Sequence, residues 1–285
     1  MKRWLLSFLS LVLIVGVLSA CGSNGSSSSG SKDSSSSKSS DTLAAAKKKG
    51  VLVVGSSNDA PFAFIDQKTK KFTGIDAEII KEVARRLGIP KVEMKQTKFE
   101  NLLLELNNKN IDLVTDAMYI NPQREKIAKF TTVWYTEGEA FIIPKKSSIK
   151  SANDLKNKVI GAQKGTAFYD FANKMKKEGK IKQVNVFGSQ SDLLLAANTG
   201  KIDALVTDGA VAAYSLKQDP SLNLKILDPY TPQAAGMIGA AARKSDTKLV
   251  NAINKQINNL KENGFIKKIL KKYGMPDNYF VPVQD

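Results

Sequence analysis

The sequence lacks histidine, and it has a single cysteine, Cys21, among its 285 residues. Without histidine, catalytic pairs of serine or cysteine with histidine are excluded, and so are imidazole ligands for a metal ion. A single cysteine excludes an internal disulfide and a cysteine cluster that would bind zinc. We expect no metal site and no cofactor.

Arginine is also scarce, because only five of the 43 basic residues are Arg. With 27 acidic residues the formal net charge is +16, which suggests a nucleic acid as the partner. However, the chain has no basic motif interleaved with aromatic residues. We therefore predict no nucleic-acid partner and interpret the charge as a lysine-rich solvated surface. Attraction to anionic lipid or wall polymers is the alternative.

The N-terminus is typical of an exported chain. A short basic start precedes an uncharged apolar run at residues 4–17, and Leu-Ser-Ala then leads directly to Cys21. The run is shorter than the roughly 20 residues that a membrane span needs, so it indicates an export signal. The placement of Cys21 resembles the lipobox of bacterial lipoproteins, in which this cysteine is lipidated. We predict a signal peptide at residues 1–20 and a lipid anchor at Cys21 on the extracytoplasmic face of the cell membrane.

The segment that follows is dominated by serine. Residues 22–41 contain twelve Ser and no aromatic or aliphatic side chain. Such a composition cannot bury enough apolar surface to offset the entropy lost on ordering. We predict that residues 21–41 form a lipidated tether with a reach of roughly 25 Å. No later apolar run is long enough to cross a membrane.

The remainder alternates between strand and helix patterns. Strands are predicted at residues 51–54, 91–94, 111–114, 159–161, 184–187 and 204–206, and helices at 76–87, 99–106, 167–177, 190–197 and 248–273. Gly264 interrupts the last helical stretch. Alternation of this kind predicts an α/β architecture with parallel sheets.

One pattern occurs twice. A leucine-rich helix, a polar turn, Ile-Asp, an apolar strand and Thr-Asp occupy residues 102–116 and again 193–208. The repeat predicts two similar lobes, although two common helix-turn-strand units could also coincide. Asp116 and Asp208 would then lie at the carboxyl ends of strands, where α/β sheets bind ligands. A cleft between the lobes follows.

Several motifs together resemble the family 3 extracellular solute-binding proteins, the binding components of amino-acid-type ABC importers. They are Asn-Asp-Ala-Pro-Phe at residues 58–62, Phe-Thr-Gly-Ile-Asp at 72–76, Asn-Pro-Gln-Arg-Glu-Lys at 121–126 and Gly-Glu-Ala-Phe-Ile at 138–142. The resemblance implies a two-lobed periplasmic-binding-protein fold of type II that closes over its solute. It places the first lobe at residues 42–142 plus 238–285 and the second at 143–237. The two crossing strands are expected near residues 140–144 and 236–242.

The resemblance also assigns a site. Arg124 would bind the α-carboxylate of the solute, since a guanidinium can donate two parallel hydrogen bonds to a carboxylate. Gly165 and Thr166 precede a helix and would bind the other carboxylate oxygen, or else only cap that helix. Asp208 would receive the ammonium group. Aromatic rings against the solute, or else packed in the core, are expected from Phe62, Phe99 and Tyr119.

Two of these positions depart from the common family pattern. Tyr119 replaces a frequent Thr or Ser, and Asp59 stands where many amino-acid binders have an aromatic residue. Asp59 with the aromatic residues is similar to the ectoine-binding subgroup, where an acidic residue holds a cyclic amidinium. Alternatively, Asp59 and Asp208 select a basic amino acid, or Asp59 caps the turn before Pro61. For Asp116 a structural role in a turn is preferred.

The predicted function is therefore binding rather than catalysis. We expect a monomeric, lipid-anchored binding protein that delivers a small zwitterionic solute to an ABC permease. A dehydratase on the same scaffold is one alternative, because some relatives act on prephenate-like acids. A sensor that reports its ligand to a membrane receptor is the other.

Overall fold

The computed structural model describes residues 41–283. The expected signal peptide, Cys21 and the tether up to residue 40 lie outside the described residues. Asp41, expected as the last tether residue, instead caps helix α1 (Thr42–Lys49), where its carboxylate accepts a hydrogen bond from the Ala44 amide over 3.1 Å. Within residues 41–283, no helix has both the length and the apolar character that crossing a membrane requires.

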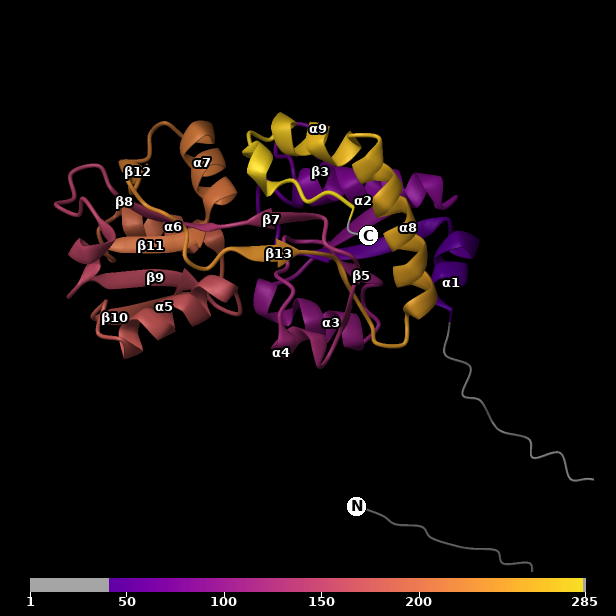
Figure 1. Ribbon diagram of the computed structural model, residues 1–285, viewed down its shortest axis with the longest axis horizontal. Helices are drawn as coiled ribbons and strands as arrows, with labels where there is room; N and C mark the ends of the chain where they lie inside the picture. The colour runs from indigo at the N-terminus through magenta and orange to yellow at the C-terminus, as the bar shows by residue number, and fades with distance from the viewer. Residues whose placement is uncertain (1–40, 284–285) are drawn as a thin grey trace, which may run out of the picture. The chain divides into compact units, whose positions relative to one another are not determined.

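The first lobe is built around a five-stranded sheet with the order β4-β1-β5-β14-β6. Its strands are β1 (Val51–Ser56), β4 (Lys91–Gln96), β5 (Leu113–Val114), β6 (Lys129–Phe130) and β14 (Ala241–Ala242). The first three are parallel, whereas β14 is antiparallel to β5 and β6. Around the sheet lie α1, α2 (Ile75–Arg86), α3 (Leu102–Asn107), α8 (Thr247–Glu262) and α9 (Phe265–Lys272) (Figure 1).

The second lobe has a sheet of the same size with the order β10-β9-β11-β8-β12. Its strands are β8 (Glu139–Pro144), β9 (Val159–Gln163), β10 (Gln183–Phe187), β11 (Ala204–Asp208) and β12 (Leu224–Ile226), and its helices are α5 (Ala167–Lys177), α6 (Gln190–Asn198) and α7 (Gly209–Gln218). Here β9, β10 and β11 are parallel, and β8 is antiparallel to both of its neighbours, β11 and β12. The sheets are therefore mixed and not purely parallel, because β8 and β14 return the chain to each sheet in the opposite direction.

Smaller elements complete the described chain. They are β2 (Phe64–Ile65), β3 (Phe72–Thr73), α4 (Pro122–Glu125) and the 3-10 turns Phe99–Asn101, Ala152–Leu155 and Asp277–Tyr279. β2 and β3 form a short antiparallel pair. Each of these elements is too short to produce a periodic apolar pattern, which explains why the strands among them were not predicted.

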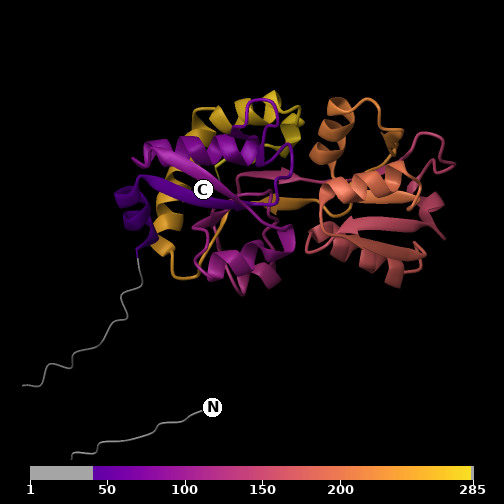
Figure 2. The ribbon, with the colours of Figure 1, turned by 180° about the vertical axis from the view of Figure 1, so that it is seen from behind.

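Two strands join the lobes. β7 (Tyr135–Glu137) and β13 (Gly236–Ile238) pair antiparallel and run from one lobe to the other (Figures 1 and 2). The predicted second crossing includes β13. The predicted first crossing at residues 140–144 is wrong, because these residues belong to β8 and pair with β11 and β12 inside the second sheet. Their apolar side chains indicate a buried strand but not which sheet it joins.

The internal repeat corresponds to a shared arrangement in both lobes. In the first, the Asp112 carboxylate accepts a hydrogen bond from the amide of Val53 on β1 over 3.0 Å. In the second, the Asp203 carboxylate accepts one from the amide of Val159 on β9 over 2.7 Å. Each aspartate thus fixes a strand beside its own in the central parallel part of the sheet. The expectation of two similar α/β lobes is confirmed.

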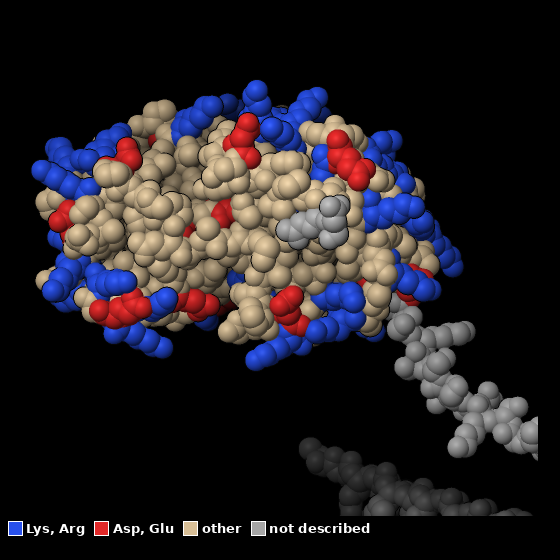
Figure 3. Space-filling model, in the orientation of Figure 1, with Lys and Arg blue, Asp and Glu red and all other residues tan. Residues whose placement is uncertain are grey.

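Lys and Arg side chains lie mainly along the margins of both lobes on the face shown in Figure 3. The strip across the middle of this face carries few of them. On this face the positive charge is therefore dispersed and does not form one continuous patch.

Candidate functional site

A cavity lies between the lobes and is lined by residues of both. From the first lobe it is lined by Asp59, Phe62, Phe99, Asp116, Ala117, Tyr119 and Arg124, and from the second by Gln163, Thr166, Ala167, Phe168, Val206, Thr207 and Asp208. Seven of the eight predicted ligand-binding residues are among them. The eighth, Gly165, contributes its backbone carbonyl at the edge of the cavity.

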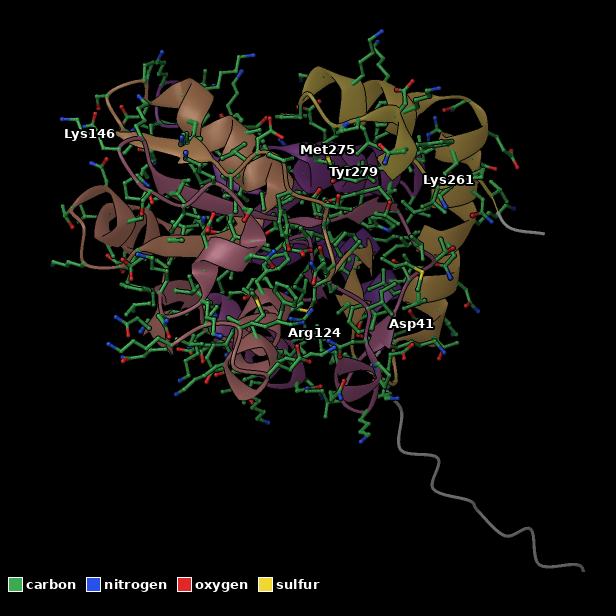
Figure 4. All side chains as sticks on the ribbon, turned by 60° about the vertical axis from the view of Figure 1, so that its left-hand side comes forward. Asp41, Arg124, Lys146, Lys261, Met275 and Tyr279 are labelled. Atoms are coloured by element: carbon green, nitrogen blue, oxygen red, sulfur yellow. The ribbon has the colours of Figure 1, made fainter. Side chains whose placement is uncertain are left out.

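Arg124 is held in place by the short helix α4. The Asn121 side chain accepts a hydrogen bond from the Arg124 amide over 2.9 Å, and Pro122 occupies the first helical position. The guanidinium donates from Nη1 to the Tyr119 carbonyl over 2.7 Å and from Nη2 to the Gly165 carbonyl over 2.9 Å (Figure 4). Burial lowers the pKa of Arg124 to about 10, so the group remains positively charged at neutral pH.

The N-terminus of α5 faces the guanidinium from the second lobe. Thr166 caps this helix: its Oγ1 accepts a hydrogen bond from the Tyr169 amide over 3.2 Å and donates one to the Gln163 carbonyl over 2.8 Å. Because Thr166 donates its hydroxyl proton to the Gln163 carbonyl, that proton is not free for a solute carboxylate. Thr166 therefore has the geometry of a helix cap. The first backbone amides of α5 remain the groups there that suit an anion.

The lobes touch each other beside the cavity. Lys164 Nζ lies 2.7 Å from Glu100 Oε2, and the rings of Phe64 and Tyr214 are 5.8 Å apart. Gly165, at φ +81°, packs against the Glu100 backbone, where an added Cβ would lie 2.9 Å from Cα. The cavity is therefore enclosed by direct contacts between the lobes.

The three predicted aromatic residues all reach the cavity, but each also has another contact. Phe99 lies 5.5 Å from the Arg124 guanidinium, and the Phe62 ring stacks with Tyr135 at 6.4 Å. The Tyr119 hydroxyl donates to the Glu137 carbonyl over 3.0 Å, and its ring meets Phe168 edge-on at 5.4 Å. Each ring therefore lines the cavity and also packs against a neighbouring side chain.

Asp208 is the last residue of β11 and immediately precedes α7. Burial, with Glu137 and Asp59 nearby, raises the pKa of Asp208 well above its usual value. A positively charged group beside it would favour the ionised carboxylate. Asp208 thus has the position and the environment of a partner for a cation.

The side chain of Asp59 does not close the turn that follows it. The backbone carbonyl of Asp59 accepts the hydrogen bonds of the turn, from the Phe62 amide over 3.0 Å and the Ala63 amide over 3.1 Å. The carboxylate instead accepts a hydrogen bond from Ser57 Oγ over 2.8 Å and lines the cavity. This geometry disfavours the turn-cap alternative.

Asp116 combines the structural role that was preferred for it with a place in the cavity wall. Its carboxylate accepts hydrogen bonds from Ser56 Oγ over 2.7 Å and from the Ser57 amide over 2.8 Å. These bonds fix the loop after β1. Its position two residues beyond β5 agrees with the expectation that it lies at a strand end.

Several lining residues carry no recognisable pattern in the sequence, and Gln163 and Ala117 are the most informative of them. Gln163 ends β9, so the rule that ligand sites lie at strand ends could have identified it. The Ala117 amide is held by the Asp76 carboxylate over 2.8 Å, and Asp76 also accepts from the Tyr135 hydroxyl over 2.6 Å. The aspartate of the motif at residues 72–76 therefore positions the cavity wall from behind.

A sequence model of the bacterial extracellular solute-binding proteins, family 3, matches residues 52–276. The chain belongs to this family. This family 3 chain is 30% identical to the arginine-binding extracellular protein ArtP of Bacillus subtilis (strain 168), over 96% of this chain and 98% of ArtP. It is 34% identical to the L-cystine-binding protein TcyA of the same organism, over 96% and 97% of the two chains.

Solved structures give the same assignment for the fold. An ancestral arginine-binding protein bound to arginine matches with a TM-score of 0.72 and 33% identity, over 79% of this chain and 98% of that one. The predicted two-lobed fold of periplasmic binding proteins is thus confirmed for this family 3 protein.

Proposed function

We propose that this protein binds an amino acid, or a zwitterion resembling one, in the cavity and delivers it to an ABC permease. The observation that carries the proposal is the placement of two opposite charges in one cavity: Arg124 from the first lobe and Asp208 from the second. A solute with a carboxylate and an ammonium group would connect the lobes through these charges. Binding would therefore favour the arrangement in which the lobes enclose the solute.

We assign a role to each side of the solute. Its carboxylate lies against the Arg124 guanidinium, with the first amides of α5 and the Gly165–Thr166 turn beside it. Its ammonium group lies against Asp208. Phe62, Phe99 and Tyr119 form the apolar walls, and a desolvated cation over such a ring is stabilised by about 0.5–2 kcal/mol.

Asp59, in the motif at residues 58–62, distinguishes two solute classes. An ectoine-type solute would place its amidinium near Asp59, whereas a basic amino acid would place its side-chain cation there. The names of ArtP and TcyA, which refer to arginine and cystine, make these two amino acids necessary members of the test panel.

A thermal-shift panel tests the proposal, because a solute that binds only the native state raises the melting temperature. The panel contains arginine, lysine, glutamine, cystine, ectoine and betaines, with D-arginine as a stereochemical control. We expect a concentration-dependent rise for at least one zwitterion and none when its carboxylate is amidated. A panel in which amidated and free solutes act alike would contradict the role of Arg124.

We further propose that Cys21 carries the lipid anchor that keeps a monomeric protein at the extracytoplasmic face. Cys21→Ser should release the protein from the membrane fraction into the medium, while the folded part retains its solute affinity. Continued recovery of Cys21→Ser in the membrane fraction would show a different anchor.

The family and the named relatives are binding proteins, which supports binding over the dehydratase alternative. Incubation of the purified protein with prephenate should therefore leave prephenate unchanged. Formation of phenylpyruvate above the uncatalysed rate would overturn this assignment.

A further inference from the structure

The hydroxyl of Ser57 contacts two carboxylates at once. Ser57 Oγ lies 2.8 Å from Asp59 Oδ2 and also makes a close contact with Asp116 Oδ2. A serine hydroxyl has one proton and can donate it to only one of them. If both carboxylates were ionised, the second contact would set two lone pairs against each other. A proton on one of the carboxyl groups removes this conflict, because that carboxyl can then donate to Ser57 Oγ.

We propose that Asp59 and Asp116 hold one proton between them through Ser57, and that a positively charged group of the solute displaces this proton. On binding, the O–H bond of the protonated carboxyl breaks and the proton passes to water. The resulting carboxylate then pairs with the cation of the solute. The inference rests on the proposed function and adds to it the class of solute, one with a guanidinium, ammonium or amidinium group that points toward Asp59.

The surroundings of the pair provide no cation that could make the proton unnecessary. The positive group in the cavity wall is Arg124 on α4, and its guanidinium is bonded to the carbonyls of Tyr119 and Gly165. The other ionisable groups on neighbouring elements are acidic: Asp208 at the end of β11, Glu137 on β7 and Asp76 on α2. Within residues 41–283, no group of three or more acidic side chains is arranged to hold a metal ion.

The electrostatic consequences agree with this geometry. Burial and the neighbouring Asp59 raise the pKa of Asp116 well above its usual value, and burial also raises the pKa of Asp59. Two carboxyl groups this close cannot both ionise easily, so their titration belongs to the pair.

A second feature of the same wall also suits a solute. Gln163 is 4% exposed and lines the cavity, and its side chain lowers the pKa of Asp59 by hydrogen bonding. Its amide therefore favours the ionised form of Asp59, which is the form that pairs with a cation of the solute.

Calorimetric titration in two buffers of different ionisation enthalpy tests the proposal, because the difference in apparent heat counts the protons released. The probes are arginine, lysine and ectoine, with glutamine as the neutral comparison. For a cationic probe that binds, we expect release of close to one proton more than glutamine releases near pH 6, and an affinity that rises with pH more steeply than that of glutamine, by up to about tenfold per unit. Glutamine, whose ammonium group faces Asp208, should release at most the proton of that carboxyl group.

Three variants separate the proton-sharing pair from a structural role. Asp116→Asn should lower the proton release of cationic probes to the level seen with glutamine and weaken their binding at least about tenfold, with little change in the binding of glutamine. Ser57→Ala should keep the fold while altering the pH dependence, which distinguishes it from a variant that fails to fold. Asp277→Asn, at an exposed site, is the matched control and should behave as the parent.

The outcomes also separate this inference from the proposed function. If a cationic probe binds and releases no more protons than glutamine does, the sharing of a proton is wrong and the proposed function stands. If only neutral zwitterions bind, the cationic class is wrong. If no zwitterion binds at all, both the inference and the proposed function fail.

Discussion

Arg124 in the first lobe donates from Nη2 to the carbonyl oxygen of Gly165 in the second lobe over 2.9 Å. The same guanidinium donates from Nη1 to the carbonyl of Tyr119 over 2.7 Å, within its own lobe. The bond to Tyr119 fixes the guanidinium within its own lobe, and the bond to Gly165 connects it to the other lobe. A side chain held in this way loses less conformational entropy when it binds a carboxylate.

Arg124→Lys should be nearly as damaging as Arg124→Ala. An ammonium group cannot reproduce the planar set of donors that contacts both lobes and a carboxylate. We expect each variant to lose about 2–5 kcal/mol of affinity for the best solute, measured by calorimetric titration. Arg85→Lys, on the exposed surface of α2, should bind as the parent does. Parent-like affinity in Arg124→Ala would show that the solute carboxylate binds elsewhere.

Gly165 offers a direct test of the contact between the lobes. In Gly165→Ala the alanine would have to adopt a left-handed backbone conformation, at φ +81°. Its Cβ would also lie only 2.9 Å from Glu100 Cα. Gly179→Ala is the matched control, because its φ is +68° but nothing lies within 4 Å of the added Cβ. Both changes should lower stability by about 1 kcal/mol. Only Gly165→Ala should also lower the affinity for the solute. In the presence of solute, only this variant should show a larger radius of gyration than the parent by small-angle scattering. Equal solute affinity in the two variants would contradict closure at this contact.

Gly236 on β13 controls the position of the Tyr119 ring, because a Cβ at residue 236 would overlap that ring. We expect Gly236→Ala to displace the ring and to weaken binding of the solute by about 1–2 kcal/mol, which is also the effect expected for Tyr119→Ala. In a double-mutant cycle the two losses should be less than additive, because both act through one ring. Additive losses would mean that Gly236 affects binding by another route. Tyr119→Phe separates the ring from its hydroxyl bond to Glu137.

Glu137 on β7 should make the protein less stable as the pH rises. Its Oε1 accepts a hydrogen bond from the Ala210 amide over 2.9 Å, while its Oε2 has no partner among the described residues. Burial raises the pKa of Glu137 from 4.5 to about 8, so between these values the folded state binds more protons than the unfolded state. The free energy of unfolding should then fall by up to about 1.4 kcal/mol per pH unit across this window.

The measurement is denaturant unfolding of the solute-free protein between pH 5 and 8. Asp76, whose pKa burial raises to about 6, adds a contribution of the same sign over a narrower window. Glu137→Gln should reduce the slope without removing it, because Asp116 and Asp208, whose pKa values are also raised, contribute with the same sign. Glu262→Gln, at the exposed end of α8, should leave the slope unchanged. An unchanged slope in Glu137→Gln would assign the pH dependence to other groups.

The sequence predicted the long elements well, because their apolar side chains repeat at the helical or strand period. α2, expected at residues 76–87, spans Ile75–Arg86, and α5 agrees at both ends. The apolar pattern of a strand does not show which strands it pairs with. For this reason the predicted crossing at residues 140–144 is wrong, and these residues belong to β8 in the second sheet. β7, with only three residues, gave no periodic signal at all.

For the site, the motifs identified residues at strand ends and helix starts, and these do meet in one cavity. The sequence could not show that Ser57 contacts both Asp59 and Asp116, because Ser57 and Asp59 lie in the loop after β1 whereas Asp116 follows β5. Nor could it show that the donors of Arg124 are already bonded to backbone carbonyls. Both features depend on distances between segments, which a pattern along one chain does not contain.

The strand β14 comes from chain that follows the whole second lobe, yet it completes the first sheet by pairing with β5 and β6. During synthesis, the second lobe is therefore finished before the first lobe has its last strand. Pairing of such distant segments is slow, because a long loop must close before any contact offsets its entropy. The second lobe, continuous in sequence, can acquire its structure while the first still has an open edge at β5. Folding should thus proceed from the inserted lobe outward, and a translation pause or a chaperone would matter most before residue 241 emerges.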